Sequence, residues 1–195
     1  MREIGVIPSI KETYKNQIEY SFDVRINKIL KQTLKKVNVS VLNFDSKIDK
    51  RFSLIIICGG NDLPTIKKNT VNKVRYKLTN EIFKKAIVKN IPMLGICYGA
   101  QFIAKKFNSK FKQKKNVGQH KIFLLEKKKY TIVNSYKNTI IKKLGKDLNA
   151  KGIAKDNSIE YFKHKNKNIL GIQWHPERYK KFKFFDKKLI KSLCI

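Results

Sequence analysis

The first candidate for chemistry is Cys97, which lies in the segment LGICYGAQ over residues 94–101. Gly95 and Gly99 flank it two residues away on each side, and this spacing is the thiol version of the nucleophile elbow. An apolar strand is expected before Cys97 and a helix after it. A sharp turn at the start of a helix exposes the nucleophile and offers backbone N–H groups to an oxyanion. The spacing therefore favours a catalytic nucleophile over a buried structural cysteine.

The second candidate is His175, in the segment GIQWHPE over residues 171–177. An apolar strand is expected to end there, and Pro176 stiffens the link to Glu177. A thiol nucleophile needs a base that takes its proton and later protonates the leaving amine. That base needs an acceptor to orient its far nitrogen. His175 with Glu177 supplies both, although a histidine at a strand end would on its own indicate a structural role.

The two other histidines fit a base less well. His164 lies in the lysine-rich stretch 163–167 and is interpreted as part of a solvated turn. His120 precedes an apolar strand and could line a pocket. Neither has a carboxylate nearby in the sequence in the pattern that a dyad needs. By elimination, His175 is the predicted base.

Short apolar runs alternate with amphipathic stretches, which is typical of an α/β layer fold. The clustered strands of the second half indicate antiparallel additions to a parallel sheet. There is no internal repeat or flexible linker, so residues 1–195 are expected to form one domain. The loop 59–62, Gly-Gly-Asn-Asp, can let a ligand approach the backbone. We expect strands over 4–10, 37–44, 54–58, 92–96, 117–125, 130–134, 152–155, 159–162 and 169–174, and helices over 19–36, 74–89, 99–107 and 180–193.

The formal net charge of +31 over 195 residues raises the question of nucleic-acid or anionic-membrane binding. Lysine greatly outnumbers arginine and is scattered through every segment, which favours a general compositional bias. Specific nucleic-acid grooves usually use arginine forks as well as lysine point charges. No nucleic-acid partner is therefore expected. The arginines are dispersed along the chain, at Arg2, Arg25, Arg51, Arg75 and Arg178.

The cysteine pattern and the absence of long apolar runs indicate a soluble cytoplasmic protein. The cysteines, Cys58, Cys97 and Cys194, are odd in number and fit neither a disulfide framework nor a zinc pattern. No secretory signal is recognisable at the N-terminus. No apolar run approaches the roughly 20 residues that span a bilayer, so no membrane contact is expected.

Together the segments 95–101 and 173–177 resemble the class I glutamine amidotransferase family. Within that superfamily, the loop 59–62 and Trp174 resemble the γ-glutamyl hydrolase branch, peptidase family C26. That branch includes hydrolases of γ-glutamyl amines and of γ-glutamyl-CDP-amidates. The resemblance implies a three-layer, flavodoxin-like fold with a mostly parallel central sheet and antiparallel additions.

The resemblance also implies roles for single residues. Cys97, His175 and Glu177 would form a triad, with backbone N–H groups of Gly60 and Tyr98 as the oxyanion hole. Further residues match family positions that meet the substrate. These substrate-binding candidates are Gln101, Ser135 and Tyr136, with Glu160 close to the pocket.

One departure concerns the substrate. Family members commonly carry a histidine just after the Asn-Ser-aromatic stretch, where this chain has Lys137 and Asn138. A lysine there could hold a different anionic group, or it could be one more solvated lysine.

The chemistry that follows is hydrolysis of the side-chain amide of glutamine or a γ-glutamyl amine through a thioester, with no metal or organic cofactor. Because no synthetase domain is attached, a stand-alone hydrolase is the leading interpretation. The alternative is a glutaminase subunit that passes ammonia to a separate synthase partner. A third hypothesis, a basic binding module with a dead site, is opposed by the intact motifs.

Overall fold

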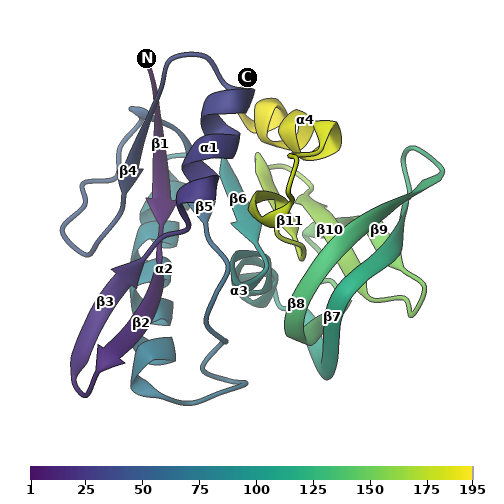
Figure 1. Cartoon of the computed structure of the whole chain (residues 1–195), viewed down its shortest axis with the longest axis horizontal. Helices are drawn as coiled ribbons and strands as arrows, with labels where there is room; N and C mark the ends of the chain where they lie inside the picture. The colour runs from purple at the N-terminus through teal and green to yellow at the C-terminus, as the bar shows by residue number, and fades with distance from the viewer. Residues whose placement is uncertain (195) are drawn as a thin grey trace.

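A nine-stranded sheet forms the centre of the computed structural model, which describes residues 1–194 (Figure 1). Its strand order is β4-β1-β5-β6-β11-β10-β8-β7-β9, and the first five strands run parallel. The remaining strands add in antiparallel fashion. The predicted parallel sheet with antiparallel additions is therefore confirmed. The strands are β1 (Arg2–Ile7), β2 (Ser9–Tyr14), β3 (Gln17–Ser21), β4 (Val37–Val41), β5 (Phe52–Ile57), β6 (Met93–Ile96), β7 (Lys110–Leu124), β8 (Lys129–Lys143), β9 (Leu148–Ala154), β10 (Ile159–His164) and β11 (Ile169–Ile172).

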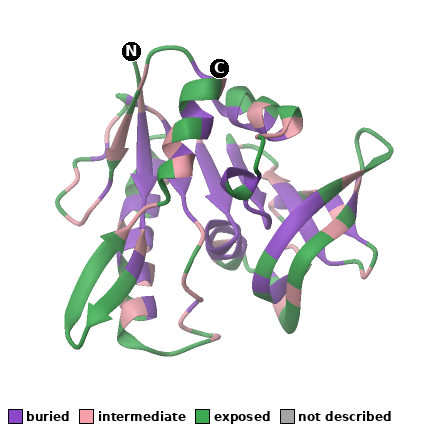
Figure 2. Ribbon diagram, in the orientation of Figure 1, coloured by how far each residue is buried: buried purple, intermediate pink, exposed green. Residues whose placement is uncertain are grey.

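Helices cover both faces of the parallel strands, which gives three layers (Figure 1). Strand residues alternate between the faces, as a period of two requires. Leu54 and Ile56 pack with α1 and α4, whereas Ile55 and Ile57 pack with α2 and α3. Because both faces are covered, β5, β6 and β11 are almost wholly buried (Figure 2). The helices are α1 (Val24–Thr33), α2 (Thr70–Val88), α3 (Tyr98–Lys106) and α4 (Phe184–Leu193), with a short 3₁₀ turn, η1 (Pro176–Arg178).

The predicted first helix, 19–36, was wrong at its N-terminal end. Residues 17–21 form β3, which pairs with β2 in a separate two-stranded sheet. The helix begins at Val24 because the Asp23 carboxylate accepts the N–H of Arg25 and caps it. The prediction from apolar spacing placed the start of the helix too early, within β3, whose side chains are mostly exposed (Figure 2). The first strand likewise ends at Ile7 rather than Ile10.

Strands β7 and β8 are each 15 residues long, well beyond the predicted 117–125 and 130–134. Their lysine-rich ends lack apolar alternation, so they pair through the backbone ladder without a sequence signal. The other predicted strands overlap their observed counterparts, with ends shifted by a few residues. Among the described helices, none is long and apolar enough to cross a membrane.

Candidate active site

Cys97 lies at the junction between β6 and α3 with φ 50° and ψ −100°, a conformation that non-glycine residues rarely adopt. Its N–H donates to the Ile172 carbonyl at 2.8 Å, which ties the turn to β11. Glycine is required on both sides. A Cβ at Gly95 would lie 2.5 Å from the carbonyl carbon of Gly99, and one at Gly99 would lie 2.1 Å from the Ile57 oxygen. The predicted elbow is therefore present, and the two glycines permit it.

His175 follows β11, and its ring is buried beside Cys97 and Glu177. Its Nδ1 lies 2.6 Å from Oε1 of Glu177, which leaves Nε2 for the Cys97 thiol. Burial alone would lower the pKa of His175, but hydrogen bonds with Cys97 and Glu177 raise that pKa to about 9. The three residues selected from the sequence thus come together, with the orientation that a nucleophile, a base and an orienting carboxylate need.

The backbone of His175 is fixed by the side chain of Asn134, in β8. The amide oxygen of Asn134 accepts the His175 N–H at 2.7 Å, and its Nδ2 donates to the His175 carbonyl at 2.8 Å. The Tyr179 hydroxyl in turn accepts the backbone N–H of Asn134 at 3.0 Å. Sequence reasoning missed this role of Asn134. The available signal was an amide within an apolar strand, since a buried amide must find partners.

Loop 59–62 lies against the base. A Cβ at Gly59 would be 2.4 Å from Cε1 of the His175 ring, so only glycine lets the ring lie there. Gly60 has φ +82°. Asn61 accepts the Ile10 N–H and donates to the Ile10 carbonyl, both at 2.9 Å, and so ties the loop to β2. The N–H groups of Gly60 and Tyr98 take no part in the backbone hydrogen bonds of the described chain. Both stay available as the predicted oxyanion donors.

The three predicted substrate-binding residues lie in different surroundings. The amide nitrogen of Gln101 donates to the Thr139 carbonyl at 3.0 Å and to Oε1 of Gln173 at 3.2 Å, within the protein. The Ser135 hydroxyl donates to the Asn116 carbonyl. Tyr136 is half exposed, with its ring 5.7 Å from that of His175. Tyr136 thus borders the base, and contact of these residues with a substrate stays a prediction.

Lys137 is not a solvated lysine. Its ammonium is buried, 2.9 Å from the Glu160 carboxylate and 3.0 Å from the Ser135 hydroxyl. His120 adds Nε2 at 3.5 Å from the same carboxylate. Burial raises the pKa of Glu160, but His120 and Lys137 outweigh this and lower it. His120 therefore lies beside a carboxylate in the fold, although that carboxylate, Glu160, is distant from it in the sequence. Because Glu160 neutralises Lys137, this ammonium has little charge left for an anionic substrate.

His164 ends β10 and is half-buried rather than solvated. Its Nδ1 accepts the N–H groups of Asn166 and Lys167 at 3.0 and 3.1 Å, and its ring packs edge-on against Phe107. It has no part in the Cys97 site.

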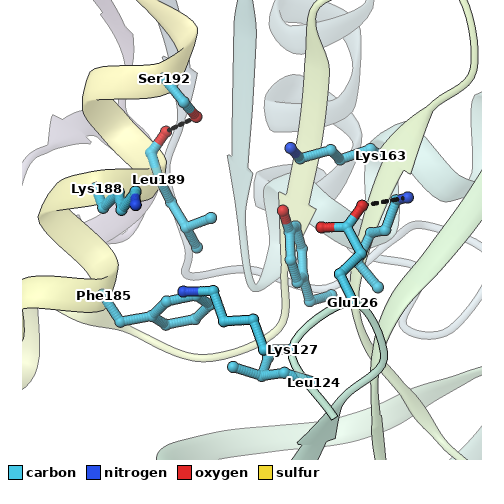
Figure 3. A pocket seen from close by; sticks show the side chains of 10 residues that line it. Leu124, Glu126, Lys127, Lys163, Phe185, Lys188, Leu189 and Ser192 are labelled. Carbon is cyan, nitrogen blue, oxygen red and sulfur yellow. Dashed lines mark hydrogen bonds and ion pairs between the residues drawn. The ribbon is translucent and has the colours of Figure 1, made fainter. Parts of the chain in front are cut away.

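A pocket of about 160 Å³ lies between α4 and the antiparallel strands (Figure 3). Its walls combine Leu124 and Phe185 with lysine side chains and Glu126, which accepts from Lys151 at 2.7 Å. It contains none of the predicted site residues. Within residues 1–194, no group of three His, Cys, Asp or Glu side chains is gathered as metal ligands.

Comparison with known proteins agrees with this geometry. Residues 20–191 match the glutamine amidotransferase class-I family. The chain belongs to the class I glutamine amidotransferase family. The γ-glutamyl-CDP-amidate hydrolase of Campylobacter jejuni is 46% identical over 125 residues, covering 64% of this chain and 62% of the relative. This glutamine amidotransferase domain therefore spans less than two thirds of that relative's length.

Other class I glutamine amidotransferases resemble the chain more distantly. A glutamine-hydrolysing GMP synthase subunit of Methanococcus aeolicus is 34% identical over 104 residues, 47% of this chain and 54% of the relative. The structure of a GMP synthase subunit of Thermoplasma acidophilum superposes with a TM-score of 0.75 at 18% identity, covering 100% of this chain and 92% of that one. A glutamine amidotransferase of Thermotoga maritima gives a TM-score of 0.66 at 18% identity, over 90% and 76% of the chains. These structural likenesses confirm the class I fold.

Proposed function

We propose that this protein hydrolyses a γ-glutamyl amide bond through a Cys97 thioester. The observation that carries the proposal is the arrangement of Cys97, at a strained turn, against a His175 ring whose other nitrogen lies 2.6 Å from Glu177. Burial shields the hydrogen bonds among these three side chains from water. Hydrogen bonds are stronger in the protein interior than in water. The family supports the reaction class, and the contacts of His175 with Cys97 and Glu177 support the roles proposed for these three residues.

The first half of the reaction forms the thioester. His175 takes the Cys97 proton, and the sulfur attacks the γ-carbonyl carbon, moving the C=O π electrons onto oxygen. The N–H groups of Gly60 and Tyr98 receive this oxyanion, each such donor contributing about 3 kcal/mol. When the oxyanion collapses, the C–N bond breaks and His175 gives its proton to the departing nitrogen.

The second half regenerates the thiol. His175 removes a proton from water, and the hydroxide attacks the thioester carbon through a second oxyanion. The C–S bond then breaks, glutamate leaves, and His175 returns its proton to the sulfur. Throughout, the Glu177 carboxylate holds His175 in the tautomer that presents Nε2 to these atoms.

The amine half of the substrate is proposed to carry phosphate groups. The C. jejuni relative is named for a CDP-amidate, whose leaving group contains a diphosphate. A hollow of about 480 Å³ in this chain joins the loop after Gly60 to the β7–β8 pair. Lys67 and Lys115 line it, and neither forms an ion pair within residues 1–194. The ammonium groups of Lys67 and Lys115, which lie near loop 59–62, are suited to bind the phosphate groups of such an amine.

An activity panel tests both parts of the proposal. The purified protein is incubated with glutamine, neutral γ-glutamyl amines and γ-glutamyl amidates of nucleoside phosphates, and glutamate release is measured. Cys97→Ala should abolish release, whereas Cys194→Ala, which removes another buried cysteine, should not. Release by Cys97→Ala at the wild-type rate would refute the thioester.

The phosphate preference is tested by removing the two unpaired lysines. A Lys67→Gln, Lys115→Gln double variant should raise KM for phosphate-bearing amidates and leave glutamine turnover unchanged. The matched control is Lys28→Gln with Lys31→Gln, which removes equal charge from exposed positions on α1. Equal effects of the two double variants would remove the support for a phosphate-bearing amine.

The second candidate function is a glutaminase subunit for a separate synthase. It is favoured by the similarity to the GMP synthase subunit of M. aeolicus. A glutaminase of this kind is nearly silent until its partner binds, whereas a stand-alone hydrolase is active alone. Rapid turnover of any panel substrate by the isolated chain therefore excludes this alternative.

A further inference from the structure

Arg75 of α2 is a buried cation without a counterion. Its side chain is 0% exposed, and within residues 1–194 no carboxylate lies within ion-pair distance of it. Its Nε and Nη1 have no hydrogen-bond partner in the described chain. Burial lowers the pKa of Arg75, although nearby Tyr98 and Cys58 oppose this. A buried charge is normally paired, because an unpaired charge in the protein interior is strongly destabilising.

The two contacts of the guanidinium reach both sides of the active site. Nη2 donates to the Cys58 carbonyl at 3.0 Å, and the guanidinium carbon lies 4.9 Å from the centre of the Tyr98 ring. Cys58 leads directly into Gly59 and Gly60, and Tyr98 follows Cys97. One side chain therefore touches the two segments that carry the proposed oxyanion donors.

The geometry points to Arg75 as a positioning residue that holds the two halves of the oxyanion hole together and places a positive charge behind it. The inference rests on the proposed acyl-transfer chemistry of Cys97. Arg75 fixes the Cys58 carbonyl, while the Cys58 N–H is fixed by the Ile7 carbonyl at 3.2 Å. Both backbone polar groups of Cys58, the residue just before loop 59–62, are thus held, which restricts the direction in which the loop leaves β5.

Because no carboxylate of the described chain neutralises it, the Arg75 guanidinium should also stabilise an oxyanion electrostatically. In a low-dielectric interior, a nearby positive charge stabilises negative charge much more strongly than it would in water. An ion pair to a carboxylate would cancel that field, and none is present within residues 1–194. A purely structural role would be met better by an apolar side chain, since replacing a buried charge by a hydrophobic residue is often neutral or stabilising.

The test separates attack that forms an oxyanion from attack that does not. p-Nitrophenyl acetate acylates a thiol through a tetrahedral oxyanion, and release of p-nitrophenolate measures the rate. Iodoacetamide alkylates the same thiol by displacement of iodide, without an oxyanion. Both rates are measured on the wild type, Arg75→Met, Arg75→Lys and the control Lys73→Met, which removes one exposed charge from the same helix. Cys97→Ala supplies the background from Cys58 and Cys194.

Arg75→Met should slow acylation of Cys97 about 10- to 100-fold while its alkylation rate matches that of Lys73→Met. Arg75→Lys, which keeps the charge but loses the planar fork, should lie between Arg75→Met and the wild type. The thermal midpoint of Arg75→Met should be at or above that of the wild type, which shows that the loss is not unfolding.

Three results overturn the inference. Equal loss of acylation and alkylation would mean that Arg75 acts on the thiol or on the fold. Unchanged acylation and alkylation rates in Arg75→Met would mean that the charge of Arg75 does not contribute to the reaction of Cys97. If iodoacetamide alkylated Cys97 of the wild type but p-nitrophenyl acetate never acylated it, the site would not stabilise an oxyanion. Because neither reagent needs the γ-glutamyl pocket, failure of the proposed substrate class would leave this test intact.

Discussion

The side chain of Asn134 bonds both backbone polar groups of His175, accepting its N–H at 2.7 Å and donating to its carbonyl at 2.8 Å. The general base is thus held through its main chain by β8 and through its ring by Glu177. Side-chain and backbone constraints together leave the imidazole little freedom, which is the preorganisation that proton transfer needs.

Replacing Asn134 by alanine should therefore damage both stability and activity. It leaves two buried backbone groups of His175 without partners, and the free energy of unfolding should fall by about 2 kcal/mol. Turnover of γ-glutamyl substrate should fall about 10- to 100-fold as the base loses its position. Asn149→Ala, at an exposed position of the antiparallel strand β9, is the control and should change neither. Wild-type kcat/KM in Asn134→Ala would contradict the assigned role.

Gly59→Ala should displace the His175 ring. The new Cβ would lie 2.4 Å from Cε1, so the ring must leave the position in which it bonds Cys97 and Glu177. Loss of a general base typically costs about 100-fold or more in rate. The clash should also lower the free energy of unfolding by about 1–3 kcal/mol. In a His175→Ala background the clash is absent, and the same glycine substitution should cost little. Equal destabilisation in the two backgrounds would show that the ring is not the obstacle.

The pKa of about 9 for His175 predicts a pH dependence of stability. Because the folded-state value lies above the ordinary 6.5, the stabilisation is fully present below about pH 6.5 and is lost as pH rises to about 9. The free energy of unfolding of the wild type should fall by about 1–3 kcal/mol over this interval relative to His175→Gln. Denaturant titrations at several pH values measure both curves. Parallel curves would mean that the imidazolium is not stabilised.

Asp186 predicts a dependence at lower pH. Its carboxylate accepts from Trp174 Nε1 at 2.8 Å, yet burial raises the pKa of Asp186 to about 6, against an ordinary 3.8. The folded state therefore holds a proton more tightly, and stability falls as pH rises through this window. Asp186→Asn keeps an acceptor for Trp174 and should be more stable than the wild type above about pH 6, by about 1–2 kcal/mol.

The difference between Asp186→Asn and the wild type should vanish below about pH 4. Trp174 is the single tryptophan of the chain, so its fluorescence follows unfolding directly. Asp45→Asn, which removes one carboxylate from an exposed position, serves as the control. A variant less stable than the wild type at about pH 8 would contradict the assignment of Asp186 as a buried acid.

The sequence allowed the reacting groups to be predicted because each lies in a short, contiguous motif. Cys97 is bracketed by glycines that the turn requires, and His175 and Glu177 are two residues apart after one strand. The layer order followed from alternating apolar runs, since each run must be buried on a face of the sheet. These features depend on local spacing, which the sequence displays.

Other features depend on which distant segments pair, and the sequence does not display that. Lys137 of β8 is buried where it meets Glu160 of β10, and His120 of β7 approaches the same Glu160 carboxylate. Asn134 meets His175 across 41 residues of chain. The hairpin over residues 9–21 was missed because helical spacing further along dominated the pattern. Such contacts follow from strand order and register, which are set by tertiary packing.

The most direct test of the Cys97 thioester is intact-protein mass spectrometry after rapid quenching with a γ-glutamyl amide. We expect the wild type to gain the mass of one γ-glutamyl group on Cys97 during turnover and to lose it when the substrate is exhausted. The Cys97→Ala variant should gain nothing and release no glutamate. Glutamate release by the wild type with no adduct on Cys97 at any time, and undiminished release by Cys97→Ala, would contradict the account.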